Sequence, residues 1–250
     1  MFVGDQGPSR RWRRPPSPAR RAVRGGDLVK PHVPAVHRAL DLVRLVVPPD
    51  VATATTPRNL HCRLAPLEAA VIRRAVPARE QEFIAGRSCA RQALHRLGAH
   101  PDALTPNLDG MLGWPRGTVG SITHCSHLRV AVAAWRDRYA GVGIDAELNR
   151  PLPPRLIAIV AAPSELAAAR EAVPPSVAID RLIFSAKEAA FKALPEQRTF
   201  DEKVVSELVV RFNVGNEFVA ATPHARVQGR WAASAHIVTF ASMRRSGERT

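Results

Sequence analysis

Two acidic side chains lie one residue apart at the end of a short apolar run, in GVGIDAELNR at positions 141–150. Apolar Val142 and Ile144 alternate with small or acidic residues, which is the period of a β-strand. Side chains two apart share one face of a strand, so Asp145 and Glu147 are expected on the same face, with Cα atoms roughly 6.5–7 Å apart. Like charges this close repel. We therefore expect a metal ion or a basic side chain between them, unless both are simply solvated.

A second charged group lies in AIDRLIFSAKEAAFKALPEQ at 178–197, which has the apolar period of a helix. On such a helix Glu188 and Lys192 are four residues apart and face the same way. An exposed pair of this kind contributes only about 0.2–0.5 kcal/mol and no chemistry. Lys187 can equally keep its ammonium in water along the helix surface. Taken alone, the segment fits an ordinary solvated face as well as a functional site.

A third group lies in GTVGSITHCSH at 117–127, ahead of a predicted strand. Thr123 and His124 follow flexible glycine backbone, which predicts a polar loop that grips a phosphate or merely turns the chain. Cys125 stands between His124 and His127, but this spacing matches no structural zinc pattern. A phosphate-binding loop and a plain turn remain the two interpretations.

Helices and strands must position these groups. A long helix is predicted over 77–100, where Gly98 suits the end and Arg79 and Arg87 remain on the more polar sides. The strand of Asp145 is expected to pair with 121–135 in a hairpin connected by RDRYA. Further along, the pattern predicts two short helices within 151–175, the helix described above, and strands over 207–214, 216–223 and 229–242. Helices and antiparallel strands in both halves predict an α+β protein, with a hint of internal duplication.

Composition limits the class of protein. The chain has 250 residues and a net charge of +14, from 36 Lys and Arg against 22 Asp and Glu. Such a charge favours polyanionic partners. No run approaches 18 apolar residues, so no membrane association is expected. Three cysteines (Cys62, Cys89 and Cys125) are too few and odd in number for a disulfide framework, which favours a reducing, cytoplasmic setting.

The basic excess is uneven along the chain. The segment 8–26, PSRRWRRPPSPARRAVRGG, combines arginine with proline, serine and glycine and has no apolar periodicity. We predict that residues 1–43 form a disordered basic extension with a short helical piece in 36–46. The remainder is divided into an N-terminal half, 44–143, and a C-terminal half, 144–250.

In their order along the chain, the three groups resemble the 4′-phosphopantetheinyl transferases of the Sfp/EntD type. The hydroxyl and histidine segment is followed by G-[IV]-D-x-E at a strand end and, about 40 residues later, by [FW]-x-x-K-E-A-x-x-K on a helix. REQEFIAGRSCARQALHRLG is similar to the family's arginine-bearing first motif, and GWPRGTVGSITHCSH to its second. The resemblance runs from about Leu45 to Phe240 and leaves out the basic N-terminus.

The resemblance implies two similar α/β halves related by a pseudo-twofold axis, with coenzyme A in the cleft between them. Asp145, Glu147 and Glu188 would bind Mg²⁺, whose preferred ligands are oxygen atoms. Lys192, together with Lys187, would neutralise the pyrophosphate as charge builds on the leaving group.

The resemblance also assigns residues to the nucleotide. Arg79 and Arg87 match family positions that bind its phosphates or adenosine. Thr123 and His124 would contact the 3′-phosphate of coenzyme A. Relatives often carry K-G-x-x-G-x-P-x-W-P, but this chain has Pro106 in place of the lysine and Leu112 in place of the proline, so one phosphate contact is in doubt.

The activity implied is transfer of 4′-phosphopantetheine from coenzyme A to a serine of an apo acyl or peptidyl carrier protein, with release of 3′,5′-ADP. Glu188, directly or through water, would remove the serine proton. A basic surface suits acidic carriers, and a chain with both halves suits a monomer. The rival classes are a basic nucleic-acid-binding protein, disfavoured because few aromatics lie among the basic residues, and another Mg²⁺-dependent phosphotransfer enzyme.

Overall fold

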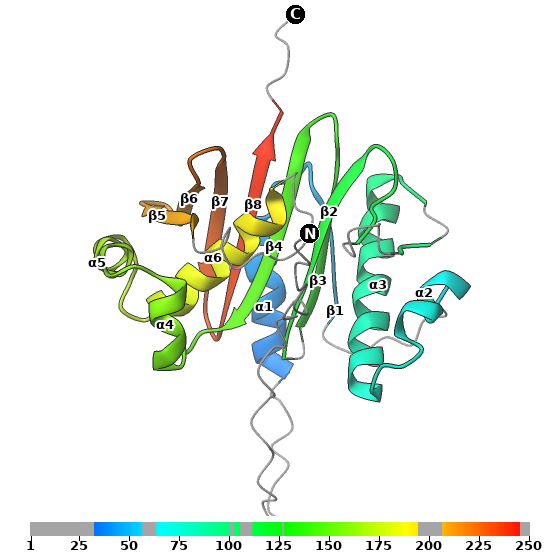
Figure 1. Ribbon diagram of the computed structural model, residues 1–250, viewed down its shortest axis with the longest axis horizontal. Helices are drawn as coiled ribbons and strands as arrows, with labels where there is room; N and C mark the ends of the chain where they lie inside the picture. The colour runs from blue at the N-terminus through cyan, green and yellow to red at the C-terminus, as the bar shows by residue number, and fades with distance from the viewer. Residues whose placement is uncertain are drawn as a thin grey trace, which may run out of the picture. The chain divides into compact units, whose positions relative to one another are not determined.

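Two antiparallel β-sheets form the framework of the fold (Figure 1). The computed structural model describes residues 33–56, 64–100, 103–105, 112–126, 128–194 and 207–245. The first sheet has the order β1–β3–β2, with the bounds Ala52–Thr56, Leu128–Trp135 and Thr118–Cys125. The second has the order β4–β8–β7–β6–β5, with the bounds Tyr139–Leu148, His236–Arg244, Arg226–Ala233, Glu217–Ala221 and Val209–Asn213.

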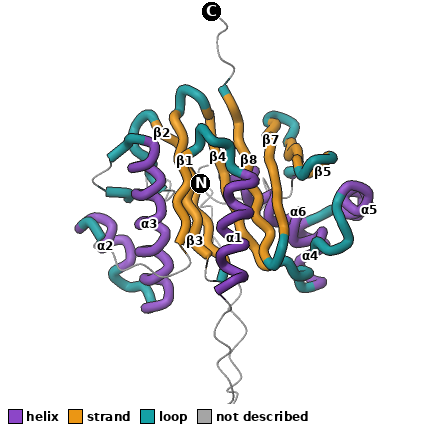
Figure 2. Tube along the Cα trace, turned by 180° about the vertical axis from the view of Figure 1, so that it is seen from behind, coloured by secondary structure: helices purple, strands orange, loops and turns teal. Residues whose placement is uncertain are grey.

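Helices cover both sheets, which confirms the predicted α+β class. In the described ranges they are α1 Val33–Val46, α2 Pro66–Ile72, α3 Pro77–Leu97, α4 Pro154–Val160, α5 Pro163–Ala172 and α6 Ile179–Ala193. Helix α3 packs on the first sheet through small side chains such as Ala90 and Ala131. Helices α6 and α1 cover opposite faces of the second sheet (Figures 1 and 2). None of the described helices has the length and apolar character needed to cross a membrane.

The predicted framework helices form where their apolar period and end signals place them. Helix α3 ends where Gly98 adopts a left-handed conformation, φ 88°, and donates its backbone N–H to the last turn. Such a conformation favours glycine, which has no Cβ to clash. Helix α6 buries one apolar face that includes Leu182, Ala186 and Ala190.

Two glycines bring α6 directly onto β4. A methyl group at Gly141 would overlap the carbonyl oxygen of Ala193, and one at Gly143 would overlap that of Ala189. The helix and strand backbones therefore touch. Because of this contact, the next residues of β4 on the same face lie directly beneath the polar side chains of α6.

The strand pairing corrects three predictions. Residues 118–125, expected as a loop, form β2 and pair with β3, whose other neighbour is β1. The predicted hairpin between 121–135 and the strand of Asp145 is wrong, because β4 pairs with β8 and begins the second sheet. The predicted single strand 229–242 is likewise two strands, β7 and β8, that pair with each other. Alternation along a strand does not identify its partner, since pairing is decided by distant residues.

The ordered framework begins earlier than expected. Helix α1 starts at Val33, within the predicted extension 1–43. Its apolar face is buried in the same core as Val142 and Ile144 of β4 and consists of Ala39, Leu42, Val43 and Val46. This spacing is the period of an amphipathic helix, so the helical piece predicted for 36–46 belongs to the core. Residues 1–32 of the predicted extension lie outside the described residues.

Candidate functional site

Asp145 lies at the centre of a polar cluster where β4, β2 and α6 meet. The residue is only 5% exposed. Its Oδ1 accepts hydrogen bonds from Lys192 Nζ at 2.8 Å and from Thr123 Oγ1 at 3.1 Å. Its Oδ2 accepts one from Ser185 Oγ at 2.9 Å, and Ser185 Oγ lies 2.9 Å from Thr239 Oγ1 of β8. A buried carboxylate needs such partners, because the loss of water around its charge is costly.

Lys192 joins the acids of two elements. Its Nζ lies 2.8 Å from Asp145 Oδ1 and 3.8 Å from Glu188 Oε2, and it donates to the Ile144 carbonyl at 3.3 Å. Burial alone would lower the pKa of Lys192, but the carboxylates of Asp145 and Glu188 raise it above its ordinary value of 10.5. The ammonium therefore stays charged at neutral pH. The structure thus brings together Asp145, Glu188 and Lys192.

Glu147, two residues beyond Asp145, is paired with an arginine that sequence analysis missed. Arg181 Nη1 lies 3.1 Å from Glu147 Oε2. The same guanidinium donates to the carbonyl oxygens of Arg150 at 3.2 Å and Pro151 at 3.3 Å. Both β4 acids therefore face α6, and Arg181 ties Glu147 to the segment that follows the strand.

The polar side chains that α6 contributes to this cluster all lie on one face of the helix. They are Arg181, Ser185, Glu188 and Lys192. Their spacing of four, three and four residues is the period of a helix face. This periodicity was the signal in the sequence that could have identified Arg181 and Ser185. Thr239 had no such signal, since its strand reaches the cluster only through sheet pairing.

The expected positive partner of the β4 acids is, in this structure, a pair of basic side chains, Lys192 and Arg181. Within the described ranges, no three His, Cys, Asp or Glu side chains are grouped closely enough to hold a metal ion. The donor chemistry nevertheless suits a hard divalent cation, which prefers carboxylate and hydroxyl oxygens. The acids also act on Cys125. Burial is the largest cause that raises the pKa of its thiol to about 12, and the charges of Glu147 and Asp145 add to it. The oxygen atoms around Asp145 are thus of the chemical kind that a magnesium ion prefers, but the described residues do not group three such acids.

Lys187 does not belong to this cluster, contrary to the prediction that it contacts the pyrophosphate. It is 2% exposed, and its Nζ lies 3.0 Å from Glu165 Oε2 of α5. Lys187 and Glu188 are neighbours in the sequence, so their side chains leave α6 about 100° apart. Lys187 is therefore a buried structural cation on the other side of the helix.

Thr123 and His124 are likewise separated by the structure. Both lie in β2, and adjacent side chains of a strand point to opposite faces. Thr123 donates to Asp145, whereas His124 Nε2 lies 3.7 Å from Glu82 Oε2 of α3. The two side chains therefore leave opposite faces of a strand that was predicted as a loop, and their contacts with the 3′-phosphate stay a prediction.

The predicted nucleotide-binding arginines lie on α3. Arg79 is exposed, and its Nη1 lies 3.5 Å from Glu82 Oε2, so Arg79 and His124 share one carboxylate. Arg87 donates from Nε to the Leu104 carbonyl at 2.8 Å, and its guanidinium lies 4.2 Å from the Phe83 ring centroid. Burial lowers the pKa of Arg87 to about 10, so the side chain is still charged at neutral pH.

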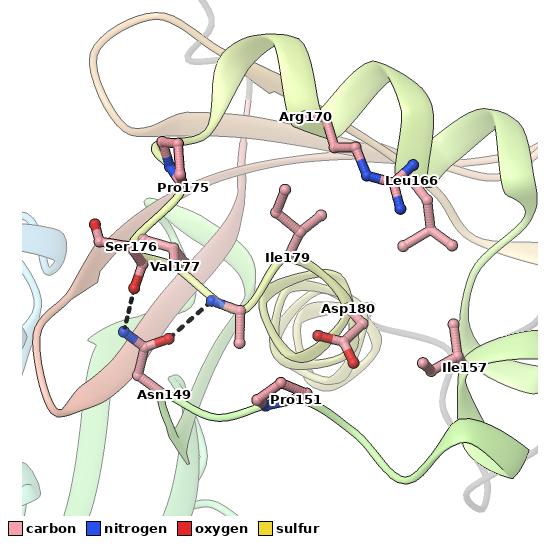
Figure 3. Close-up of a pocket in the computed structure, with 11 residues that line it drawn as sticks. Asn149, Pro151, Ile157, Leu166, Arg170, Pro175, Ser176, Val177, Ile179 and Asp180 are labelled. Atoms are coloured by element: carbon pink, nitrogen blue, oxygen red, sulfur yellow. Dashed lines mark hydrogen bonds between the residues drawn. The ribbon is translucent and has the colours of Figure 1, made fainter.

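A cavity of about 440 Å³ lies beside the N-terminal end of α6 (Figure 3). Ile157, Leu166 and Ile179 give it an apolar lining, and Arg170 and Asp180 add one charge of each sign. Pro151, which also lines the cavity, accepts a hydrogen bond from the same Arg181 that pairs with Glu147. The cavity is therefore connected to the acidic cluster by one side chain.

Comparisons with known proteins agree along the described core. The family model described as "4′-phosphopantetheinyl transferase N-terminal domain" matches residues 67–134, and that of the "4′-phosphopantetheinyl transferase superfamily" matches 141–228. The chain is 42% identical over 194 residues to the 4′-phosphopantetheinyl transferase Svp of Streptomyces mobaraensis, which covers 71% of this chain and 77% of the relative. It is 35% identical over 190 residues to PptT of Mycobacterium tuberculosis, covering 70% and 84%. It is 37% identical over 158 residues to Npt of Nocardia iowensis, covering 61% and 68%.

Proposed function

The chain belongs to the 4′-phosphopantetheinyl transferase superfamily, and on this premise we propose that it moves the 4′-phosphopantetheine group of coenzyme A to a serine of an apo carrier protein. The observation that carries the proposal is the charged cluster of Asp145, Lys192 and Glu188. It combines fixed carboxylates with a permanently charged ammonium in one place, as transfer of a phosphoryl group requires.

Asp145, Glu147 and Glu188 are the residues we expect to hold Mg²⁺. When bound, the ion would polarise the phosphoryl oxygens of the pyrophosphate. The hydrogen bonds from Ser185 and Thr123 fix the Asp145 carboxylate in one orientation. Such fixed orientation matters, because a side chain that must reorganise during the reaction stabilises the transition state less.

Lys192 is proposed to stabilise the charge that builds on the departing 3′,5′-ADP. Its raised pKa keeps the ammonium protonated, so the charge is present before the reaction starts. Glu188 is proposed to accept the proton of the carrier serine, directly or through water. Its side chain is 15% exposed, compared with 7% for that of Asp145, and it is therefore the acid that an incoming hydroxyl reaches more easily.

Arg79, Arg87 and His124 are proposed to bind the nucleotide part of coenzyme A. Arg87 is held by Leu104 and Phe83 in a fixed position on α3. Arg79 is exposed, and its long contact with Glu82 is a surface pair of small energy that an anionic ligand can displace.

An acidic carrier protein is the proposed acceptor, since the chain carries a net charge of +14. The cavity offers this acceptor an apolar surface that carries one cation, Arg170, and one acid, Asp180 (Figure 3). One chain contributes every residue of the cluster, which supports a monomer as the working unit. We place the enzyme in the cytoplasm, because Cys89 and Cys125 are free thiols in the described part of the chain.

The direct test is incubation of the full chain with coenzyme A, Mg²⁺ and several apo carrier proteins, followed by mass spectrometry. We expect one phosphopantetheine group to be added to a carrier, and none when the metal is chelated. Transfer of a phosphoryl group without pantetheine would instead favour another phosphotransfer enzyme. No modification of any carrier would overturn the proposal.

A further inference from the structure

Two histidines meet at the C-terminal end of α3, the opposite end of the helix from Arg79. His95 lies in the last turn of the helix, and His100 lies in the segment that follows it. His95 Nε2 and His100 Nδ1 are 3.2 Å apart, and the two rings meet edge to face with their centroids 4.2 Å apart. Both residues are exposed. Two ring nitrogens therefore lie side by side at the surface of the protein.

The backbone holds the two rings together. Gly98 has the left-handed conformation that ends α3, and its N–H donates to the His95 carbonyl at 3.1 Å. The N–H of Ala99 donates to the Leu94 carbonyl at 2.8 Å. These two bonds close the helix end and turn the chain back, so that His100 returns to the last turn. Because the turn is already fixed, a ligand held by both rings needs little further ordering of the chain.

The separation of the two ring nitrogens matches that of two ligands on one metal ion. Imidazole nitrogens bind Zn²⁺ at about 2.0–2.1 Å, so two of them in tetrahedral positions are about 3.3–3.4 Å apart. The same distance fits a hydrogen bond from one neutral ring to the other. A metal ion or a single proton can therefore join the rings. Both residues are exposed, so water can supply the remaining ligands of a metal ion.

The charges around the pair favour a cation. The C-terminal end of a helix carries partial negative charge from its last carbonyl groups, so α3 stabilises a cation beside its last turn. The arginines on the neighbouring turns are engaged elsewhere, because Arg91 pairs with Glu68 and Arg96 donates to the Thr53 carbonyl of β1. Imidazole nitrogen suits Zn²⁺ and Cu²⁺, whereas Mg²⁺ prefers oxygen ligands. The histidine pair therefore selects a transition metal over Mg²⁺.

We propose that His95 and His100 form a binding site for a transition metal ion such as Zn²⁺, separate from the candidate active site. From Arg79 to His95 the helix axis rises about 24 Å. A metal ion held by both rings fastens the segment after α3 to the last turn of the helix. Leu104 follows in the chain, and its carbonyl oxygen accepts the 2.8 Å hydrogen bond that holds Arg87. Metal binding should therefore stabilise the end of the framework on which Arg87 depends.

The test is calorimetric titration of the full chain with Zn²⁺, and separately with Mg²⁺, in the absence of coenzyme A and carrier. We expect a site that binds Zn²⁺ and that Mg²⁺ does not occupy. His95→Gln and His100→Gln should each lower the Zn²⁺ affinity of that site at least about tenfold, since removing even the partners of metal ligands costs about 10–100-fold. The exposed His224→Gln, between β6 and β7, is the matched control and should keep the site.

Thermal unfolding gives an independent measurement of the same site. Zn²⁺ should raise the unfolding temperature of the unaltered chain and of His224→Gln, and the rise should be smaller in both His95→Gln and His100→Gln. Both variants change exposed side chains, so both are expected to fold.

Three results would overturn the inference. They are absence of Zn²⁺ binding to the unaltered chain, equal Zn²⁺ affinity in all four proteins, and a loss confined to one of the two variants, since the ion would then not be shared. Each of them would leave His95 and His100 as a hydrogen-bonded pair. The measurements use no carrier protein, so their outcome and that of the carrier-modification test are independent.

Discussion

The two halves of the described chain anchor their long helices in the same way. In the N-terminal half, Glu68 of α2 is fully buried and accepts the backbone N–H groups of Ala65 and Leu104, each at 2.9 Å. The same carboxylate pairs with Arg91 of α3. In this way a single buried acid joins the short helix, the long helix and a distant backbone segment.

Glu165 repeats this arrangement in the C-terminal half. It lies in α5, again after an Ala-Pro-x step, and accepts the backbone N–H groups of Ala162 at 3.1 Å and Val210 at 2.9 Å. Its ionic partner is Lys187 of α6. The hint of internal duplication in the sequence thus has a counterpart in specific contacts.

The halves differ in the face that each long helix turns toward its sheet. Helix α3 presents small apolar side chains such as Ala85, Cys89 and Ala93, whereas α6 presents Ser185, Glu188 and Lys192 to the acids of β4. The shared contacts belong to the framework, and the contacts without a counterpart form the candidate site. This comparison separates the two lysines of the K-E-A-x-x-K motif: Lys187 pairs with the framework acid Glu165, and Lys192 lies in the candidate site.

The largest expected effect comes from the framework acids. Glu165→Ala leaves Lys187 buried and unpaired and should lower the free energy of unfolding by about 3–5 kcal/mol. Glu68→Ala should cost less, because the side chain of Arg91 is 23% exposed and can reach water. Urea denaturation of both variants measures the difference. A larger loss in Glu68→Ala would contradict our account of the two anchors.

The second prediction concerns the cation of the cluster. Lys192→Gln should lower the rate of carrier modification about 10²–10³-fold, the usual effect of removing one group that stabilises transition-state charge. Arg96→Gln, in the last turn of α3, is the matched control and should leave the rate unchanged. Single-turnover kinetics monitored by mass spectrometry give both values. Similar losses of rate in Lys192→Gln and Arg96→Gln would contradict the account in which α6, and not α3, carries the charge that acts in the reaction.

The third prediction tests how closely each helix lies on its sheet. Gly143→Ala places a methyl group on the Ala189 carbonyl and should destabilise the protein by about 1–3 kcal/mol, with loss of activity as α6 moves from β4. Gly86→Ala on α3 meets only Ile122 at 3.4 Å and should be neutral or stabilising, since alanine favours the helix. Thermal unfolding distinguishes them. An unaffected Gly143→Ala would mean that α6 is not fixed by this contact.

The smallest expected effect is on the pH dependence of the free energy of unfolding, through a histidine of the second sheet. Burial lowers the pKa of His236 below its ordinary value of 6.5. The unfolded chain therefore takes up a proton more readily, so the contribution of neutral His236 is present above pH 6.5 and is lost as the pH falls through its folded pKa. We expect the free energy of unfolding to decline in that range, and to decline less in His236→Phe. Parallel pH profiles for the two proteins would show that His236 plays no part.

Local patterns predicted much of this fold, and distant contacts account for what they missed. The period of α3 and α6, the stop at Gly98 and the shared face of Asp145 and Glu147 depend on neighbouring residues only, and all were predicted correctly. Strand partners depend on residues far away in the chain, and the predicted hairpin to β4 was wrong for that reason.

The errors at the site have the same origin. Lys187 was assigned to the phosphate because a sequence motif does not show which side of a helix meets a buried acid from α5. Pro106, one of two departures from the family pattern, lies outside the described residues.

The most direct test of the central claim is the Mg²⁺ dependence of carrier modification in Asp145→Asn, compared with the exposed Glu171→Gln of α5. If the acids of β4 and α6 hold the ion at the reacting pyrophosphate, Asp145→Asn should need far more Mg²⁺ or lose activity, while Glu171→Gln follows the unaltered chain. The same Mg²⁺ dependence and rate in all three proteins would contradict the account.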